Sequence, residues 1–227
     1  QKGLAHGIGV EEQYVLIRYG IACGPPKEPL LTRRMRYSLG LTENDKIVAM
    51  VACLKSQKNP LDFITCAERV LESHPQTKFL LIGDGVLRSR LEALVAKKGL
   101  EDSIFLLGWR IDVEDIYPMV DVFVLTSLWE GLPLVFLEAM HFAKPIVAYD
   151  VCAAAEVVKD GVNGFLVRPQ NTQELSAKVS LLLHDENLRH RMGHFGRHFA
   201  SDEAYQSRFM VKQIEGLYEE AMDSGKG

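Results

Sequence analysis

The feature that most constrains the fold is an alternation between short β-branched runs and helical patterns, from about Lys46 to Val167. Buried-type strands are predicted at 46–53, 77–83, 103–108, 120–126, 145–149 and 164–167. Helices are predicted between them at 59–74, 86–100, 112–120, 133–143 and 152–159. Strand–crossover–strand repetition predicts a mostly parallel sheet with helices on both faces.

The two ends of the chain follow other patterns. QYVLIRYG (13–20) predicts a strand, and LLTRRMRYSLG (30–40) predicts a helix. After Pro169 the patterns are helical only, at 171–184, 185–199 and 202–222. We therefore expect an α/β class chain, with one doubly wound parallel domain, an N-terminal extension and C-terminal helices.

Composition narrows the class of protein. With 227 residues, 47% of them hydrophobic, the chain can bury one substantial core or two small ones. A net charge of −4 and a pI near 6 argue against a nucleic-acid partner. The sequence has neither a long apolar run nor a signal-type leader, and Cys23, Cys53, Cys66 and Cys152 form no C-x-x-C pair. We expect reduced, mostly core thiols, a cytoplasmic location and, from the first residue Gln1, a piece of a longer protein.

Binding is expected at the carboxyl ends of the strands, where helix N-termini point into the crevice. The loops at that edge are LKSQKN, GDG, GWR, SLWEGLP and DVCAAAE. Small residues, helix N-termini and lysines suit phosphate, and the loops hold no cluster of metal ligands. A nicotinamide dehydrogenase is disfavoured because the G-x-G-x-x-G fingerprint is missing.

Two glutamates lie in the largely apolar segment SLWEGLPLVFLEAM (127–140). Glu130 falls in the loop after the fourth strand, and Pro133 suits the first turn of the next helix. Glu138 lies on an otherwise apolar helix, where a carboxylate is costly unless it is paired. Because helical side chains lean toward the N-terminus, Glu138 is expected to face the same pocket as Glu130. Phosphate at the helix tip and sugar hydroxyls on the carboxylates would satisfy both groups.

With these residues the chain resembles the C-terminal, nucleotide-sugar-binding domain of a GT-B glycosyltransferase of the retaining group 1 family. The resemblance covers about 14–222, and its most specific element is EGLPLVFLEAM (130–140). Supporting segments are ACLKSQKNP, FLLIGDG, LGWR, DVFVLTS and EVVKDGVNGFLV.

The resemblance implies a domain plan and an activity. The plan is a linker and edge segment (1–45) leading from a missing N-terminal domain, a Rossmann-like donor-binding domain (46–200), and a crossing helix with a tail (201–227). The implied activity is retaining transfer of a glycosyl group from a UDP- or GDP-sugar, without metal or cofactor, to an acceptor that the missing domain holds. The chain alone is expected to bind donor weakly and to transfer nothing, and any membrane contact is expected through the missing half.

The resemblance also implies roles for residues. Glu130 would contact the sugar hydroxyls, Glu138 the ribose, and Lys58 the diphosphate and the leaving-group charge. The expected donor-binding set also has backbone amides, a base-side wall and small or basic loop residues: Gly131, Leu132, Leu134, Val135, Trp109, Arg110, Gly83 and Lys55.

Three departures from the family pattern leave an alternative open. V-A-C-L stands where the family has V-G-R-L, so Cys53 replaces an arginine, with Lys55 as a candidate substitute and a core position expected for the thiol. Cys152-Ala153 replaces a Gly-Gly pair, and Tyr19 replaces a polar residue. Loss of the arginine supports a catalytically impaired binding or scaffold module of the same fold. A sugar-nucleotide epimerase, the other alternative, lacks the glutamate pair.

Three histidines four residues apart also need an interpretation. His190, His194 and His198 share one helical face, which would suit a metal ion. Because arginines flank them and acidic ligands were not expected nearby, we interpret this face as solvated and basic.

Overall fold

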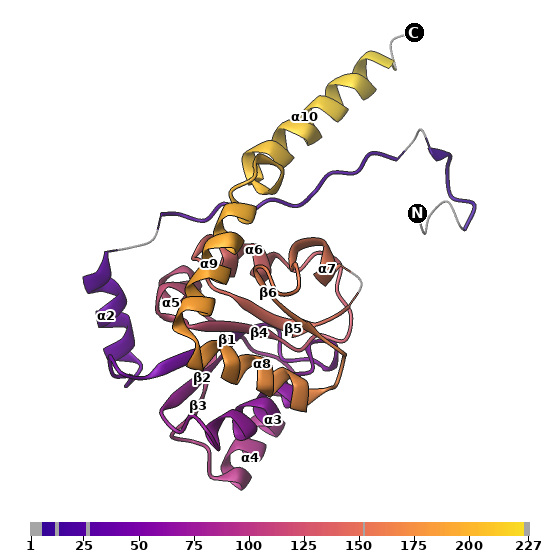
Figure 1. Ribbon diagram of the computed structural model, residues 1–227. Coiled ribbons are helices and arrows are strands. Elements are labelled where there is room, and N and C mark those ends of the chain that lie inside the picture. The colour runs from indigo at the N-terminus through magenta and orange to yellow at the C-terminus, as the bar shows by residue number, and fades with distance from the viewer. Residues whose placement is uncertain (1–5, 12–13, 26–27, 152, 225–227) are drawn as a thin grey trace. The chain divides into compact units, whose positions relative to one another are not determined.

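The computed structural model describes residues 6–11, 14–25, 28–151 and 153–224 of the chain (Figure 1). The chain forms two compact units, which are Cys23–Ser201 and the combination of 1–22 with 202–227. The first unit contains the sheet and the candidate site. Within the described residues, no helix combines the length and apolar character needed to cross a membrane.

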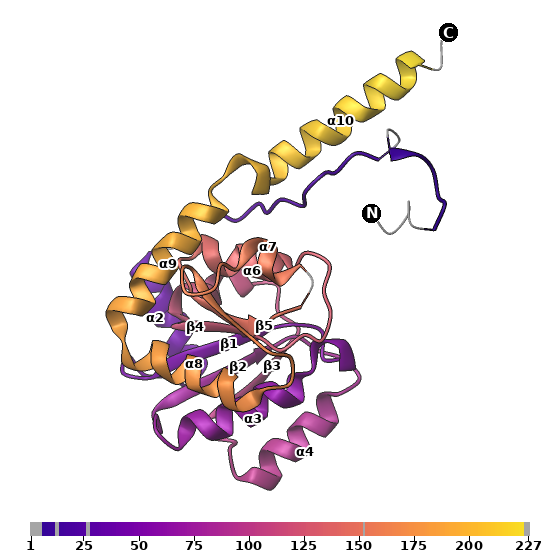
Figure 2. The ribbon, with the colours of Figure 1, turned by 45° about the vertical axis from the view of Figure 1, so that its right-hand side comes forward.

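The first unit is built on a six-stranded sheet in which every paired strand is parallel (Figure 2). The strands are β1 (Lys46–Val51), β2 (Thr77–Ile82), β3 (Ile104–Gly108), β4 (Val122–Leu125), β5 (Ile146–Tyr149) and β6 (Gly164–Val167). Their order, β3-β2-β1-β4-β5-β6, is that of a Rossmann-type sheet. The chain winds outward in opposite directions from β1 and from β4, so the crevice for a ligand is expected at the carboxyl ends of these two neighbours.

Helices cover both faces of the sheet (Figures 1 and 2). On one face α3 (Pro60–Leu71) contacts α8 (Thr172–His184) and α4 (Arg88–Lys98). On the other face lie α2 (Pro29–Ser38), α5 (Val113–Ile116), the 3₁₀ turn η3 (Tyr117–Met119), α6 (Leu134–His141) and α9 (Glu186–Ala200). The predicted doubly wound α/β class is therefore confirmed.

Along each strand, alternate side chains point to opposite faces of the sheet. Ile47 and Ala49 of β1 pack with Leu80 of β2 against Ile116 at the end of α5. On the opposite face the Phe79 ring meets Phe63 of α3 edge-on, with 5.8 Å between ring centroids. Because both faces are buried, every strand is apolar at nearly every position. This is the physical origin of the runs that predicted the strands.

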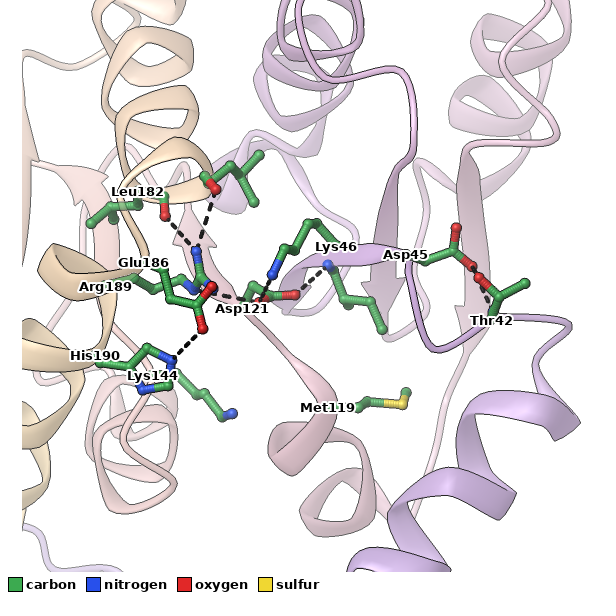
Figure 3. Close-up of polar contacts among 12 residues, drawn as sticks. Thr42, Asp45, Lys46, Met119, Asp121, Lys144, Leu182, Glu186, Arg189 and His190 are labelled. Atoms are coloured by element: carbon green, nitrogen blue, oxygen red, sulfur yellow. Dashed lines mark hydrogen bonds and ion pairs between the residues drawn. The ribbon is translucent and has the colours of Figure 1, made fainter.

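A polar cluster closes the amino-terminal edge of β4 (Figure 3). The Asp121 carboxylate accepts a hydrogen bond from the Ile47 backbone N–H at 2.8 Å, and it lies 3.4 Å from Nε of Arg189 and 3.6 Å from Nζ of Lys46. The Arg189 side chain is only 7% exposed, and it also donates to the carbonyl of Leu182 at 2.9 Å. Asp121 thereby links β1, β4 and α9.

The prediction of a strand at 13–20 is wrong for the described residues of that range, which begin at Tyr14. The segment is irregular, and the Val15 and Leu16 side chains are exposed. Only Ile21 pairs, in a single parallel bridge with Gln206 at the start of the last helix. A β-branched run forms a strand only where a partner takes its backbone hydrogen bonds. The second unit also contains the 3₁₀ turn η4 (Glu203–Tyr205) and the helix α10 (Ser207–Ser224), so the single helix predicted at 202–222 is divided after Tyr205.

Three helix predictions need smaller corrections. The helix expected at 112–120 is divided into α5 and η3, because Pro118 cannot supply the N–H that would continue the α-helix. The helix expected at 152–159 is the single turn α7 (Ala154–Val157), with residue 152 outside the described residues. Pro133 is the N-cap of α6 and not its first helical residue.

Candidate functional site

The site begins with two loops that end neighbouring strands. Lys58 closes the 3₁₀ turn η2 (Ser56–Lys58) after β1, and Glu130 lies in the loop after β4. The Lys58 ammonium forms an ion pair with the Glu130 carboxylate, and their side chains are only 19% and 8% exposed. These residues are 72 positions apart in the sequence. They meet at the switch point of the sheet, where Rossmann-type folds bind ligands.

Hydrogen bonds tie these two loops together. The buried Thr126 hydroxyl lies 2.9 Å from the carbonyl oxygens of both Lys58 and Asn59. The Gln57 amide donates to the Trp129 carbonyl at 2.9 Å, and the Leu128 N–H donates to the Gln57 carbonyl at 2.8 Å. The backbones that carry Lys58 and Glu130 are therefore held against each other before any ligand binds.

A cavity of about 410 Å³ opens around the ion pair. Its walls come from the ends of β1 and β2, the loop after β3 and the start of α6: Val51, Ala52, Cys53, Lys58, Ile82, Gly83, Trp109, Arg110, Val113, Glu130, Leu132, Pro133, Leu134 and Val135. The N–H groups in the first turn of a helix have no acceptor within that helix, and the helix dipole favours an anion there. The eight-residue helix α6 presents this turn to the cavity that also holds Lys58.

Gly83 and Gly85 allow the segment after β2 to approach the segment after β1 closely. Their φ angles are 130° and 155°, which residues with side chains rarely adopt. A Cβ on Gly83 would lie 2.0 Å from the Ala52 carbonyl oxygen, and one on Gly85 would lie 2.6 Å from that of Leu54. The G-D-G sequence is thus required by the contact between the ends of β1 and β2.

The loop after β3 supplies the exposed ring of Trp109 and the guanidinium group of Arg110, which is paired with a carboxylate. Trp109 is 78% exposed at the rim of the cavity. Arg110 makes a two-point contact with Asp112, with Nε–Oδ1 at 2.8 Å and Nη2–Oδ2 at 2.5 Å. This hydrogen-bonded carboxylate raises the pKa of Arg110 above its usual value. Both cations that line the cavity, Lys58 and Arg110, are therefore paired with acids.

Glu138 lies in a second cavity of about 670 Å³, which adjoins the first through Val51, Val113 and Val135. Its Oε2 accepts a hydrogen bond of 2.7 Å from the Tyr117 hydroxyl. Burial raises the pKa of Glu138 from its usual 4.5, while the Tyr117 hydrogen bond lowers it and Glu114 raises it. The cavities that Glu130 and Glu138 line share these three wall residues, so the two carboxylates face adjoining parts of one crevice.

Most of the predicted site residues come together around the first cavity. Eight of them line it: Lys58, Glu130, Leu132, Leu134, Val135, Trp109, Arg110 and Gly83. Lys55 and Gly131 do not line either of these cavities. Both residues are exposed, Lys55 at the N-cap of η2 and Gly131 in the loop after β4. The prediction that Cys53 is a core residue is wrong, because β1 ends at Val51 and the thiol is exposed in the cavity. Leu54 takes the buried position instead.

Tyr117 and Thr126 make side-chain hydrogen bonds at the site that sequence reasoning missed. Tyr117 belongs to the broken pattern DIYPMV, and Thr126 ends an apolar run. Thr126 offered one signal, because a hydroxyl at the carboxyl end of a fully buried strand needs a partner. Tyr117 gave none, since its contact with Glu138 joins residues that neither sequence pattern relates.

His190, His194 and His198 are exposed on α9, and His190 lies 3.4 Å from Glu186. The described residues contain no group of three or more histidines, cysteines or acids that could hold a metal ion. The histidine face is thus exposed to solvent, and the acid Glu186 lies beside it, where a basic face without a nearby acidic ligand was expected.

Comparisons with known proteins agree with this fold. Residues 32–199 match the model of the family described as glycosyl transferases group 1. The chain is 39% identical over 132 residues to the UDP-Gal:alpha-D-GlcNAc-diphosphoundecaprenol alpha-1,3-galactosyltransferase of Escherichia coli, covering 57% of this chain and 34% of that protein. It is 30% identical over 189 residues to the alpha-D-kanosaminyltransferase of Streptomyces kanamyceticus, covering 82% of this chain and 48% of that protein. The chain thus spans about half or less of the length of these relatives.

Solved structures share the architecture. The crystal structure of Anabaena Alr3699/HepE in complex with UDP and glucose is 25% identical in sequence and superposes with a TM-score of 0.87, covering 96% of this chain and 60% of that one. The sheet order, the paired loops at the switch point and the family match over most of the sequence lead to one conclusion. The chain belongs to the glycosyl transferases group 1 family, and its sheet is the Rossmann-like α/β sheet of GT-B glycosyltransferases.

Proposed function

We propose that the chain is the donor-binding domain of a retaining glycosyltransferase that uses a UDP- or GDP-sugar. The observation that carries this proposal is the buried pair of Lys58 and Glu130 at the switch point of the sheet, beside the first turn of α6. A cation, unpaired helix N–H groups and a carboxylate in one cavity suit a ligand that combines phosphate with hydroxyls. The Escherichia coli and Anabaena relatives, whose names specify UDP-galactose and UDP, support a nucleotide-sugar donor.

In this proposal the residues act on different parts of the donor. Lys58 and the N–H groups of Leu134 and Val135 hold the diphosphate, Glu130 accepts from sugar hydroxyls, and Glu138 accepts from the ribose. The bond between the sugar carbon and the diphosphate breaks, and its electron pair stays on the diphosphate oxygen. The acceptor hydroxyl oxygen forms the new bond to that carbon on the same face, and its proton passes to the departing diphosphate oxygen. Fixed positive charge and helix N–H groups stabilise the departing diphosphate.

The acceptor and the rest of the machinery are assigned to a second domain outside this chain. The chain spans about half or less of the length of the relatives compared above. Because Lys58 and Arg110 already pair with Glu130 and Asp112, an incoming diphosphate must compete with carboxylates. We expect weak donor binding, with dissociation constants well above those of complete transferases, and no glycosyl transfer by the chain alone.

The second candidate function is a binding module with impaired catalysis. The observation that favours it is Cys53, which lines the donor cavity at the position where the family resemblance implied an arginine. Because cysteine carries no positive charge, the diphosphate leaving group has one cation fewer to stabilise it. On this reading Cys53→Arg strengthens diphosphate binding, because it adds an unpaired cation to the cavity.

Calorimetric titration of the chain with UDP and with GDP tests the proposal. We expect saturable binding of at least one nucleotide, loss of binding in Glu138→Ala, and retention in Glu92→Ala, which removes an exposed glutamate from α4. If neither nucleotide binds at millimolar concentration, the donor-binding function is wrong. If the chain alone transfers sugar from a UDP- or GDP-sugar, the assignment of the acceptor site to a second domain is wrong.

A further inference from the structure

The side chain of Tyr117 lies beside Glu138 and is held in a fixed position by the core. Tyr117 is 1% exposed, and its ring stacks on Phe142 with 5.5 Å between centroids and 10° between planes. On another side the ring meets Phe123 at 6.0 Å. Since the ring cannot turn without breaking these contacts, the position of its hydroxyl is fixed by the core. That hydroxyl is the donor that meets Oε2 of Glu138 at 2.7 Å.

The charges around Glu138 make this single hydrogen bond important. The groups that act on the carboxylate are Tyr117 from η3, Glu114 from α5 and Cys23 from the segment before α2. Glu114 is another acid, and burial together with Glu138 and Glu114 raises the pKa of the Cys23 thiol to about 12, so the thiol is neutral. Burial also raises the pKa of Tyr117 well above its usual 10, so this hydroxyl keeps its proton and remains a donor.

The geometry leaves one carboxylate oxygen for a ligand. Tyr117 occupies Oε2, while the Glu138 side chain lines the cavity of about 670 Å³ together with Val135, Val113 and Tyr117 itself. A carboxylate fixed through one oxygen presents the other in a defined direction, so it offers a preorganised acceptor for a ribose hydroxyl.

We infer that Tyr117 is a positioning residue for the donor site, which holds the Glu138 carboxylate in place so that its Oε1 accepts from the nucleoside hydroxyls. This inference rests on the proposed function, since it requires a ribose at Glu138. Tyr117 acts through Glu138 and does not itself touch the reacting atoms.

The test uses Tyr117→Phe, which keeps the stacked ring and removes only the hydroxyl. The matched control is Tyr37→Phe, because Tyr37 also donates to a glutamate, Glu43, at 3.0 Å, but on the exposed surface of α2. Thermal unfolding of both variants checks that they fold. Each is titrated with the tighter-binding nucleoside diphosphate of UDP and GDP, and with its 2′,3′-dideoxy form, which lacks the ribose hydroxyls.

We expect Tyr117→Phe to weaken binding of the ordinary nucleotide about tenfold, the scale of one hydrogen bond to a charged group. Binding of the dideoxy nucleotide should be unchanged by this substitution, because the hydroxyls through which Tyr117 acts are missing. Tyr37→Phe should change neither affinity. In a Glu138→Gln background, the additional effect of Tyr117→Phe should disappear, because there is no carboxylate left to position.

A pH series with the corresponding nucleotide sugar, which has no phosphate group titrating near neutral pH, gives a second readout. Binding requires the ionised carboxylate, so affinity should fall as pH falls through the pKa of Glu138. The Tyr117 hydrogen bond lowers that pKa, so its removal should move this acid limb to higher pH. If Tyr117→Phe weakens ordinary and dideoxy nucleotides alike, or leaves both affinities and the acid limb unchanged, the inference is overturned while the proposed function stands. If wild type binds neither UDP nor GDP, the proposed function fails and the inference fails with it.

Discussion

The polar cluster around Asp121, at the amino-terminal end of β4, allows the loss in free energy of unfolding caused by one substitution to be predicted from geometry. Asp121→Asn keeps an oxygen that can accept from the Ile47 N–H, but it removes the negative charge beside Arg189. The Arg189 side chain is 7% exposed and the Asp121 side chain 17%, so water cannot replace the lost carboxylate efficiently. Breaking one partner of such a buried pair typically costs about 3–5 kcal/mol.

The structure places the expected loss near the lower end of that range. Arg189 still donates to the carbonyls of Leu182 at 2.9 Å and Leu183 at 3.3 Å, which partly solvate its charge. We therefore expect the free energy of unfolding to fall by about 3 kcal/mol. With a urea slope of about 2 kcal/mol per molar, the midpoint should fall by about 1.5 M.

Urea unfolding followed by tryptophan fluorescence suits this measurement, because both tryptophans, Trp109 and Trp129, belong to the unit that contains the sheet. The control is Glu92→Gln, which breaks a shorter pair with Arg88, 2.8 Å against 3.4 Å, on an exposed helix surface. We expect less than about 0.5 kcal/mol there. Equal losses in the two variants, or no loss in Asp121→Asn, would refute the argument that burial and not distance decides the strength of these pairs.

Two further predictions concern a buried amine and an exposed thiol. Burial lowers the pKa of Lys144 from 10.5 to about 8, so between these pH values the unfolded chain binds more protons than the folded one. The free energy of unfolding of wild type should therefore rise with pH across this window relative to Lys144→Met, by up to about 3 kcal/mol, and parallel urea-midpoint curves would contradict this. Cys53 should react with a maleimide in the native chain while the fully buried Cys66 does not, and saturating UDP should slow the reaction of Cys53. Peptide mass spectrometry measures both rates, and equal labelling of the two thiols would show that the exposure described for Cys53 is wrong.

Local patterns predicted most of the fold correctly because they report properties that neighbouring residues share. A strand buried on both faces must be apolar throughout, so the runs at 46–53 and 77–83 were identifiable before any partner was known. The run at 13–20 also contains β-branched and aromatic residues, yet its described part forms no strand. Composition shows that a segment is able to pair, whereas pairing itself requires a neighbouring strand.

The candidate site was predicted in outline for a similar reason. Parallel strands that alternate with helices place all their following loops at one edge, so Lys58 and Glu130 could be assigned to the same crevice from sequence order. The sequence could not tell that these two residues pair with each other, or that Cys53 is exposed while Leu54 is buried.

The sequence by itself determined the fold class, the position of the binding edge and the acidic motif on α6, because each follows from hydrophobic periodicity and from the direction of consecutive strands. Only the tertiary structure decided which groups meet there. It paired Glu130 with Lys58 and gave Glu138 the Tyr117 hydroxyl as its partner. The physical reason is that a hydrogen bond depends on distances of a few ångströms between residues far apart in the sequence, and these distances are set only when the helices and the sheet have packed.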